Sequence, residues 1–241
     1  MNRSLFLFVS AILLGACGDK APEATKTGAD TGIDVAAPVA PAEIPREIIF
    51  GNPERTVARI SPDGNHVSWL APKDGVMNVW VAPTDDPDNA RVITNDTYRG
   101  IPVYYWAPNS RYVYFIQDNG GDENFHVYSS DINSGEVRDL TPAEEGVRAG
   151  IEMVSSARPD HIVVGLNERD PQFFDLFIVD VTTGERELLK ENPGYGGWLI
   201  DNSLEPRFGL QPTPDGGANI VDFDGEVFSV IPPEDFLVTQ E

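Results

Sequence analysis

A two-anchor repeat constrains the fold of this 241-residue chain more than any other feature of its sequence. The first anchor is a proline-centred turn followed by a strand rich in Val, Ile, Trp or Tyr, and it recurs at steps of 46 and 51 residues. Its prolines are Pro62, Pro108 and Pro159. The second anchor is a hairpin glycine, which recurs at steps of 49 and 41 residues and suits turns that require a positive φ. Its glycines are Gly135, Gly184 and Gly225.

Short runs of β-branched and aromatic residues fill the units between these anchors, and no stretch from about Pro45 onward keeps a helical period. The region is therefore predicted to be all-β. Four short strands in each period of about 40 to 50 residues are typical of a β-propeller blade. The sequence predicts a partial β-propeller of about four four-stranded blades, and the repeat disfavours the rival, a β-sandwich of irregular strands. The expected blades span about 55–95, 101–142, 147–191 and 196–232.

The amino-terminal segment, residues 1–16, has the order of a secretory signal peptide: Arg3, then an apolar run from Leu5 to Leu14, then small residues. Its ending, LLGAC, resembles the lipobox of bacterial lipoproteins, in which cleavage precedes the cysteine and the thiol carries a diacylglyceryl group. Lipidation is therefore expected at Cys17, the single cysteine of the chain. A plain secretory signal with a chance cysteine is the alternative.

Residues 17–44 are rich in Ala, Pro, Thr, Gly and Asp and contain no aromatic residue. Such a composition predicts a flexible tether between the lipid and a propeller region that spans 45–241. The acyl chains would anchor the protein in the cell envelope, on the periplasmic side, without spanning the membrane. Gly18 after the cysteine, rather than Asp, resembles lipoproteins that are sorted to an outer membrane.

The net charge of the chain limits the classes of partner that it can bind. Its 39 acidic residues outnumber its 17 basic residues, for a net charge of −22. A chain of this charge repels nucleic acid and anionic lipid head groups, so no nucleic-acid partner is expected. The acidic residues are spread along the sequence, which indicates a role in solubility rather than one site.

Three stretches together carry a family resemblance: RISPDGNHVSWLAPKDGVMNVWV, WAPNSRYVYFIQDNGGDENFHVYSSD and GWLIDNSLEPRFGLQPTPDGG. They resemble the N-terminal propeller of the prolyl oligopeptidase family of serine peptidases, and within it the acylaminoacyl-peptidase and dipeptidyl-aminopeptidase-like enzymes of bacteria. The resemblance covers about residues 45 to 241. It implies a seven- or eight-bladed propeller that lies over an α/β-hydrolase domain, restricts access to short peptides and contributes substrate contacts.

The sequence departs from that family pattern in two respects. It ends at Glu241 after about four blades, and it contains no G-x-S-x-G motif, the turn that carries the nucleophile of such hydrolases. We therefore expect the non-catalytic propeller portion of an exported peptidase, gating or binding short peptides for a hydrolase domain absent from this chain. No catalytic residue is predicted, and no peptidase activity for the chain alone. The alternative is a stand-alone periplasmic propeller that binds a protein or peptide partner.

The stretch DNGGDENFHVYSSD, residues 118–131, holds the densest group of polar candidates. An EF-hand loop needs Gly at its sixth position and Glu at its twelfth, where this stretch has Glu123 and Ser129. That pattern fails, and we predict no metal site and no cofactor. The composition favours a plain loop between two strands. The alternative, an irregular cation site or a contact with substrate or partner, would use Asp122, Glu123 and His126.

Two further features of the sequence are candidate sites. His66 and His161 occupy matching positions of the repeat, at the start of a second strand, which indicates structural roles. The pair Glu144–Glu145 resembles the glutamates with which dipeptidyl peptidases hold a substrate amine. Those glutamates lie on a helical insertion that this sequence does not show, so the role is not transferred and both charges are expected to be solvated.

Overall fold

The computed structural model describes residues 43–236, and all the described strands lie in the unit that begins at Pro45. The predicted signal peptide, Cys17 and almost all of the predicted tether lie outside the described residues. Within the described part, the α-helices are the short segments α1 (Arg46–Phe50) and α2 (Pro233–Phe236). Neither they nor any other described segment forms a helix long and apolar enough to cross a membrane.

The described strands form four antiparallel sheets of four strands each, which we number as blades 1 to 4. Blade 1 contains β1 (Thr56–Ile60), β2 (His66–Lys73), β3 (Val76–Pro83) and β4 (Arg91–Val92). Blade 2 contains β5 (Tyr104–Trp106), β6 (Tyr112–Gln117), β7 (His126–Asp131) and β8 (Val137–Asp139). Blade 3 contains β9 (Ala149–Val154), β10 (His161–Asp170), β11 (Phe173–Asp180) and β12 (Arg186–Lys190). Blade 4 contains β13 (Gly197–Ile200), β14 (Pro206–Pro212), β15 (Ala218–Val221) and β16 (Val227–Ile231).

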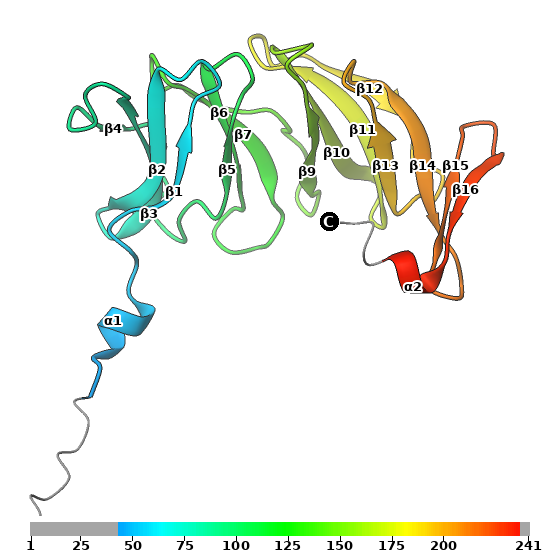
Figure 1. The fold of residues 1–241 in the computed structure, drawn as a ribbon, viewed down its shortest axis with the longest axis horizontal. Helices are drawn as coiled ribbons and strands as arrows, with labels where there is room; N and C mark the ends of the chain where they lie inside the picture. The colour runs from blue at the N-terminus through cyan, green and yellow to red at the C-terminus, as the bar shows by residue number, and fades with distance from the viewer. Residues whose placement is uncertain (1–42, 237–241) are drawn as a thin grey trace, which may run out of the picture. The chain divides into compact units, whose positions relative to one another are not determined.

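In every blade the strands are hydrogen-bonded in chain order, so each sheet is a simple up-and-down meander. Figure 1 shows the sheets following one another in the order of the sequence, from β1 to β16. The predicted fold, a partial β-propeller of about four four-stranded blades, is therefore confirmed.

The predicted hairpin glycines close the turns between the third and fourth strands. Gly135 and Gly184 have φ of 74° and 81°, a region in which a side chain is strained. Each donates its backbone N–H to the carbonyl of an aspartate four residues earlier, Asp131 at 2.8 Å and Asp180 at 2.7 Å. Gly225 repeats the positive φ at 89°. The second anchor of the repeat is thus a backbone requirement of the hairpins.

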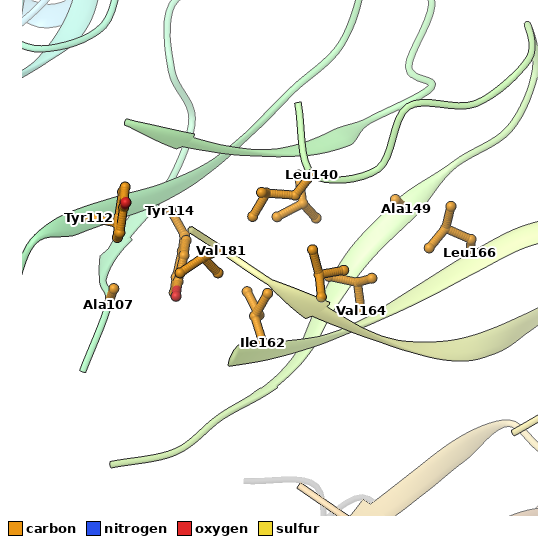
Figure 2. Close-up of a cluster of buried hydrophobic side chains, with 11 residues drawn as sticks. Ala107, Tyr112, Tyr114, Leu140, Ala149, Ile162, Val164, Leu166 and Val181 are labelled. Carbon is orange, nitrogen blue, oxygen red and sulfur yellow. The ribbon is translucent and has the colours of Figure 1, made fainter. Parts of the chain in front are cut away.

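The second strands of blades 2 and 3 are buried on both faces, which explains their nearly continuous apolar runs. In β10, Ile162, Val164 and Leu166 point toward blade 2, and Val163 packs against blade 4. Figure 2 shows the first set in one buried cluster with Tyr112, Tyr114 and Leu140 of blade 2. Alternate residues of one strand therefore join two different neighbours, as the period of two in a strand requires.

Blades 1 and 2 are joined by buried polar contacts as well as apolar ones. The Ser68 hydroxyl oxygen accepts a hydrogen bond from the indole Nε1 of Trp106 at 2.8 Å, and it lies 3.0 Å from the hydroxyl of Tyr104. Tyr104 donates to the Val57 carbonyl at 2.6 Å. Because both partners of each bond are provided, these buried groups are not left unsatisfied.

Candidate functional site

A cavity of about 410 Å³ lies at one end of blade 2. Its walls come from the loop between β6 and β7 and from the loop between β8 and β9. These two loops meet at the same edge of the sheet, where the N–H of Ala149 donates to the carbonyl of Phe125 at 2.7 Å. We call this cavity the blade 2 pocket, and its side chains with polar or aromatic groups are Asn119, Asp122, Asn124, His126, Tyr128, Asp139, Glu144 and Glu145.

His126 lines this pocket from the start of β7. Its Nδ1 lies 3.1 Å from Oδ2 of Asp139, which ends β8. Its ring stacks beside that of Tyr128, with 6.5 Å between the centroids. The imidazole is thus held by a carboxylate on one side and an aromatic ring on another, while part of it faces the cavity.

Asp122 is also in the pocket, but its carboxylate is largely committed to its own turn. Oδ1 accepts the backbone N–H groups of Asn124 at 3.0 Å and Asn119 at 3.2 Å, and Oδ2 accepts the Asn124 side-chain amide. The hydrogen bond from the Asn124 backbone is the main reason that the pKa of Asp122 lies below its ordinary value. Asp122 therefore stays ionised and shapes the rim.

Glu123 is not among the residues that line the pocket. It has a φ of 61° and donates its backbone N–H to Asp118 at 3.2 Å. The structure thus places Asp122 and His126 in the lining of one pocket and leaves Glu123 out of it.

Three lining carboxylates were not predicted as site residues: Asp139, Glu144 and Glu145. Asp139 is brought beside His126 by the pairing of β7 with β8, in which Tyr128 lies opposite Asp139. Glu144 and Glu145 reach the pocket through the loop to blade 3. Four of the lining residues are acidic and none is Lys or Arg, so the pocket favours a positively charged group.

The repeat explains why blade 2 has this cavity. Asn78 in blade 1 and His126 in blade 2 each precede a third-strand valine whose N–H bonds a threonine at 2.9 Å, so they are structurally equivalent. Asn78 is fully buried, and its amide bonds Thr94 and the backbone of Asp96 in the loop that follows.

His126 turns instead toward Asp139 in its own sheet. It makes no hydrogen bond to the loop between β8 and β9 among the bonds of the described residues. No hydrogen bond from the His126 side chain therefore holds the loop between β8 and β9 against the sheet. The space between His126 and that loop is the pocket.

The other histidines lie elsewhere. His66 begins β2 and its ring lies 6.3 Å from that of Trp106, whereas His161 begins β10. Within residues 43–236, no group of three or more His, Cys, Asp or Glu side chains is arranged to hold a metal ion.

No protein-family model matches the chain. It is 42% identical over 201 residues to dipeptidyl aminopeptidase BIII of Pseudoxanthomonas mexicana, in an alignment that covers 81% of this chain and 29% of the relative. It is 26% identical over 179 residues to dipeptidyl peptidase family member 6 of Caenorhabditis elegans, covering 72% of this chain and 24% of the relative. The chain thus spans less than a third of either curated relative. Among solved structures, the β-propeller domain of the Trilobed protease from Pyrococcus furiosus aligns with a TM-score of 0.47 and 21% identity, over 76% of this chain and 58% of that one.

Proposed function

Since this chain carries propeller blades of the prolyl oligopeptidase family of peptidases, we propose that it is the peptide-binding propeller part of an exported aminopeptidase of that family. The observation that carries the proposal is the acidic blade 2 pocket, in a chain 42% identical to a dipeptidyl aminopeptidase. In this proposal the propeller restricts access to short peptides and holds them for a hydrolase domain.

The charge of the pocket supports a role at the amino end of a peptide. An aminopeptidase must distinguish the free terminus of its substrate from the interior of a chain, and the terminus carries a positive charge. The carboxylates of Asp139, Glu144 and Glu145 lie around one cavity that has no Lys or Arg in its lining. Such a concentration of one sign of charge attracts and orients an ammonium group.

The size of the pocket supports short substrates. A cavity of about 410 Å³ is near the lower end of the range for ligand sites, about 300–1,000 Å³, so it suits one or two residues. Tyr128 and Ala143 supply apolar surface beside the charges, against which a side chain could pack.

In this proposal, a separate hydrolase domain carries out the hydrolysis. The 241 residues contain no G-x-S-x-G motif, and we propose that the chain by itself does not cleave peptides. The proposal also includes location in the cell envelope through a lipid on Cys17, for which the LLGAC sequence is the support. Metabolic labelling with a fatty acid, compared between the chain and its Cys17→Ser variant, tests that part separately.

Isothermal titration calorimetry of the purified chain tests the peptide-binding role. The dipeptide Gly-Phe is compared with acetyl-Gly-Phe, which lacks the terminal charge. We expect the free dipeptide to bind about tenfold more tightly, since loss of one charge-assisted contact changes affinity on that scale.

Two double variants locate the binding. Glu144→Gln with Glu145→Gln should weaken binding of Gly-Phe about three- to tenfold, because both charges leave the pocket. Glu185→Gln with Glu187→Gln removes the same charge from an exposed hairpin of blade 3 and should leave the affinity unchanged. Equal affinity for both dipeptides, or equal loss in both double variants, would contradict the proposal.

A further inference from the structure

A second cavity, of about 280 Å³, lies at the equivalent end of blade 3. It is formed by the hairpin between β10 and β11 and by the loop that leads from β12 to β13, the same pair of connections that form the pocket of blade 2. Its lining differs, because aromatic rings replace most of the charges. We call it the aromatic pocket, and its principal residues are Glu152, Phe173, Phe174, Asn192, Tyr195 and Trp198.

The aromatic wall is held in a fixed arrangement. Tyr195 and Trp198 meet edge to face, with 5.2 Å between centroids and an angle of 90°. The ring of Tyr195 lies directly on the backbone of Gly209, where a Cβ would come within 2.4 Å of the ring. Any other residue at position 209 would displace the ring, so the close approach depends on this glycine.

The loop that carries Tyr195 is fixed from beneath by Asn192, which is buried with 5% of its surface exposed. Its side-chain oxygen accepts the N–H groups of Gly194 at 2.9 Å and Tyr195 at 2.6 Å. Its side-chain amide donates to the carbonyls of Phe174 and Tyr195. With both ends of the side chain satisfied, the loop is preorganised rather than shaped by a ligand.

Asp175 and Arg169 hold Asn192 in place in turn. Asp175, only 4% exposed, accepts the backbone N–H of Asn192 at 2.6 Å and forms a two-point ion pair with Arg169, at 2.7 and 2.8 Å. Arg169 also donates to the carbonyl of Asn192 at 2.8 Å. The carboxylate of Asp175 is thus engaged by Arg169 and by the backbone of Asn192, and it does not line the cavity.

Glu152 is the carboxylate that faces the cavity, from the middle of β9. An added Cβ at Gly165 would come within 2.7 Å of its Oε1, so the absence of a side chain there makes room for the carboxylate. Desolvation raises the pKa of Glu152, while the residue remains accessible to a ligand. Among the described residues, no hydrogen bond or ion pair engages its carboxylate.

One ring of the lining, that of Phe174, lies near a cation of the chain itself. The guanidinium of Arg148 lies 5.9 Å from the centroid of Phe174. Arg148 forms no ion pair with Glu152 in the described part of the chain. The pocket therefore combines aromatic faces with an unpaired carboxylate, the two groups that together favour an organic cation.

We propose that the aromatic pocket binds a single alkylammonium group, carried either on a lysine side chain or on the free amino end of a peptide. The ammonium meets Glu152, and its apolar stem lies between Phe173, Tyr195 and Trp198. The volume suits one side chain rather than a larger ligand, since drug-sized ligands occupy about 300–1,000 Å³. This site is separate from the blade 2 pocket, and it does not depend on a peptidase function.

Nuclear magnetic resonance of the purified full chain tests the proposal. The reporter is the indole N–H signal of Trp198, identified by its disappearance in Trp198→Phe. Three probes are titrated. Nα-acetyl-lysine methylamide carries an ammonium group on its side chain, and leucine methylamide carries one at its amino end. Nα-acetyl-norleucine methylamide is the neutral relative of the first. We expect at least one of the two ammonium probes to shift the signal at about tenfold lower concentration than the neutral probe. The comparison between the ammonium probes identifies the source of the cation.

A pair of variants assigns the carboxylate. Glu152→Gln should weaken binding of the ammonium probe about tenfold. Glu187→Gln, a substitution at an exposed position in the same blade, should leave the affinity unchanged. If Glu152→Gln failed to fold, the comparison of charged and neutral probes on the unmodified chain would still decide. The proposal is overturned if neither ammonium probe shifts Trp198, or if the neutral probe does so equally well. It is also overturned if a folded Glu152→Gln variant binds ammonium as before. Since the blade 2 pocket contains no tryptophan, failure here leaves the dipeptide result unaffected.

Discussion

The imidazole Nδ1 of His126 lies 3.1 Å from Oδ2 of Asp139, across the boundary between β7 and β8. The two residues are only partly covered, with side-chain exposures of 18% and 29%. Their contact orients the imidazole in the lining of the blade 2 pocket. The second carboxylate oxygen of Asp139 accepts the backbone N–H of Thr141 at 2.8 Å. Asp139 thus links the histidine to the loop that carries Glu144 and Glu145.

Replacing this carboxylate should affect binding more than folding. Asp139→Asn removes a charge from the pocket and should lower the affinity for Gly-Phe about three- to tenfold. The free energy of unfolding should change by no more than about 1 kcal/mol, because partly exposed ion pairs contribute little. Calorimetric titration and urea denaturation measure the two quantities. Asp88→Asn, on an exposed loop of blade 1, is the control and should alter neither.

Two buried tyrosines should respond in opposite ways to loss of their hydroxyl groups. The Tyr114 hydroxyl is buried and has no hydrogen-bond partner among residues 43–236, whereas that of Tyr104 donates to Val57 at 2.6 Å. Tyr114→Phe should be neutral or should stabilise the fold, since it removes an unsatisfied group. Tyr104→Phe should destabilise it by about 1 kcal/mol or more, because an acceptor is left unpaired. Thermal and urea unfolding of both variants make the comparison, and a clear loss of stability in Tyr114→Phe would show that its hydroxyl has a partner.

The contact between blades 2 and 3 should depend on Leu166, which is fully buried. Leu166→Ala should lower the free energy of unfolding by about 2–5 kcal/mol, the usual range for a cavity left by a buried leucine. Leu188→Ala, at a position 51% exposed on β12, should cost much less. Equal effects in the two variants, measured by urea unfolding, would mean that this interface is looser than the packing indicates.

Asp63, in the proline turn of blade 1, should have a pKa below the ordinary value of an aspartate. The Ser61 hydroxyl donates to Asp63 at 2.6 Å, and with the backbone N–H of Asn65 it lowers the pKa of Asp63 to about 2. Because the folded pKa lies below the unfolded value of about 3.9, ionised Asp63 favours the folded state above pH 4, and that contribution is lost as the pH falls toward 2. Carbon-13 titration of the carboxyl measures the pKa directly. In Ser61→Ala it should rise toward its ordinary value, and an unchanged pKa would remove Ser61 as the main cause.

The fold was accessible to sequence reasoning because its requirements are local. Positive φ at Gly135 and Gly184 and alternating apolar residues in β10 are properties of a few neighbouring positions, and the hairpin glycine recurs in blades 2, 3 and 4. Four sheets therefore follow from a repeat that is visible in the sequence. The pairing of blades face to face needs no further signal, since strands that are apolar on both faces must pack on both sides.

The candidate site was only partly accessible. Asp122 and His126 were singled out because they lie in one polar stretch, and both line the pocket. Glu123 lies between them in sequence but does not line the pocket. Asp139 joins them through strand pairing, and Glu144 through the path of a loop, neither of which leaves a pattern in the sequence. Clustering in the sequence thus indicates where the pocket lies but not which residues line it.

The unequal packing between blades has a consequence for how the molecule opens. Within the described part of the chain, eleven buried residues join blades 2 and 3 and ten join blades 1 and 2, but only four join blades 3 and 4. When repeats contact only their neighbours, stability is a sum of local terms and need not be lost everywhere at once. Amide protons of β14 and β15 should therefore exchange with solvent before those of β6 and β10, through partial openings that leave the first three blades folded.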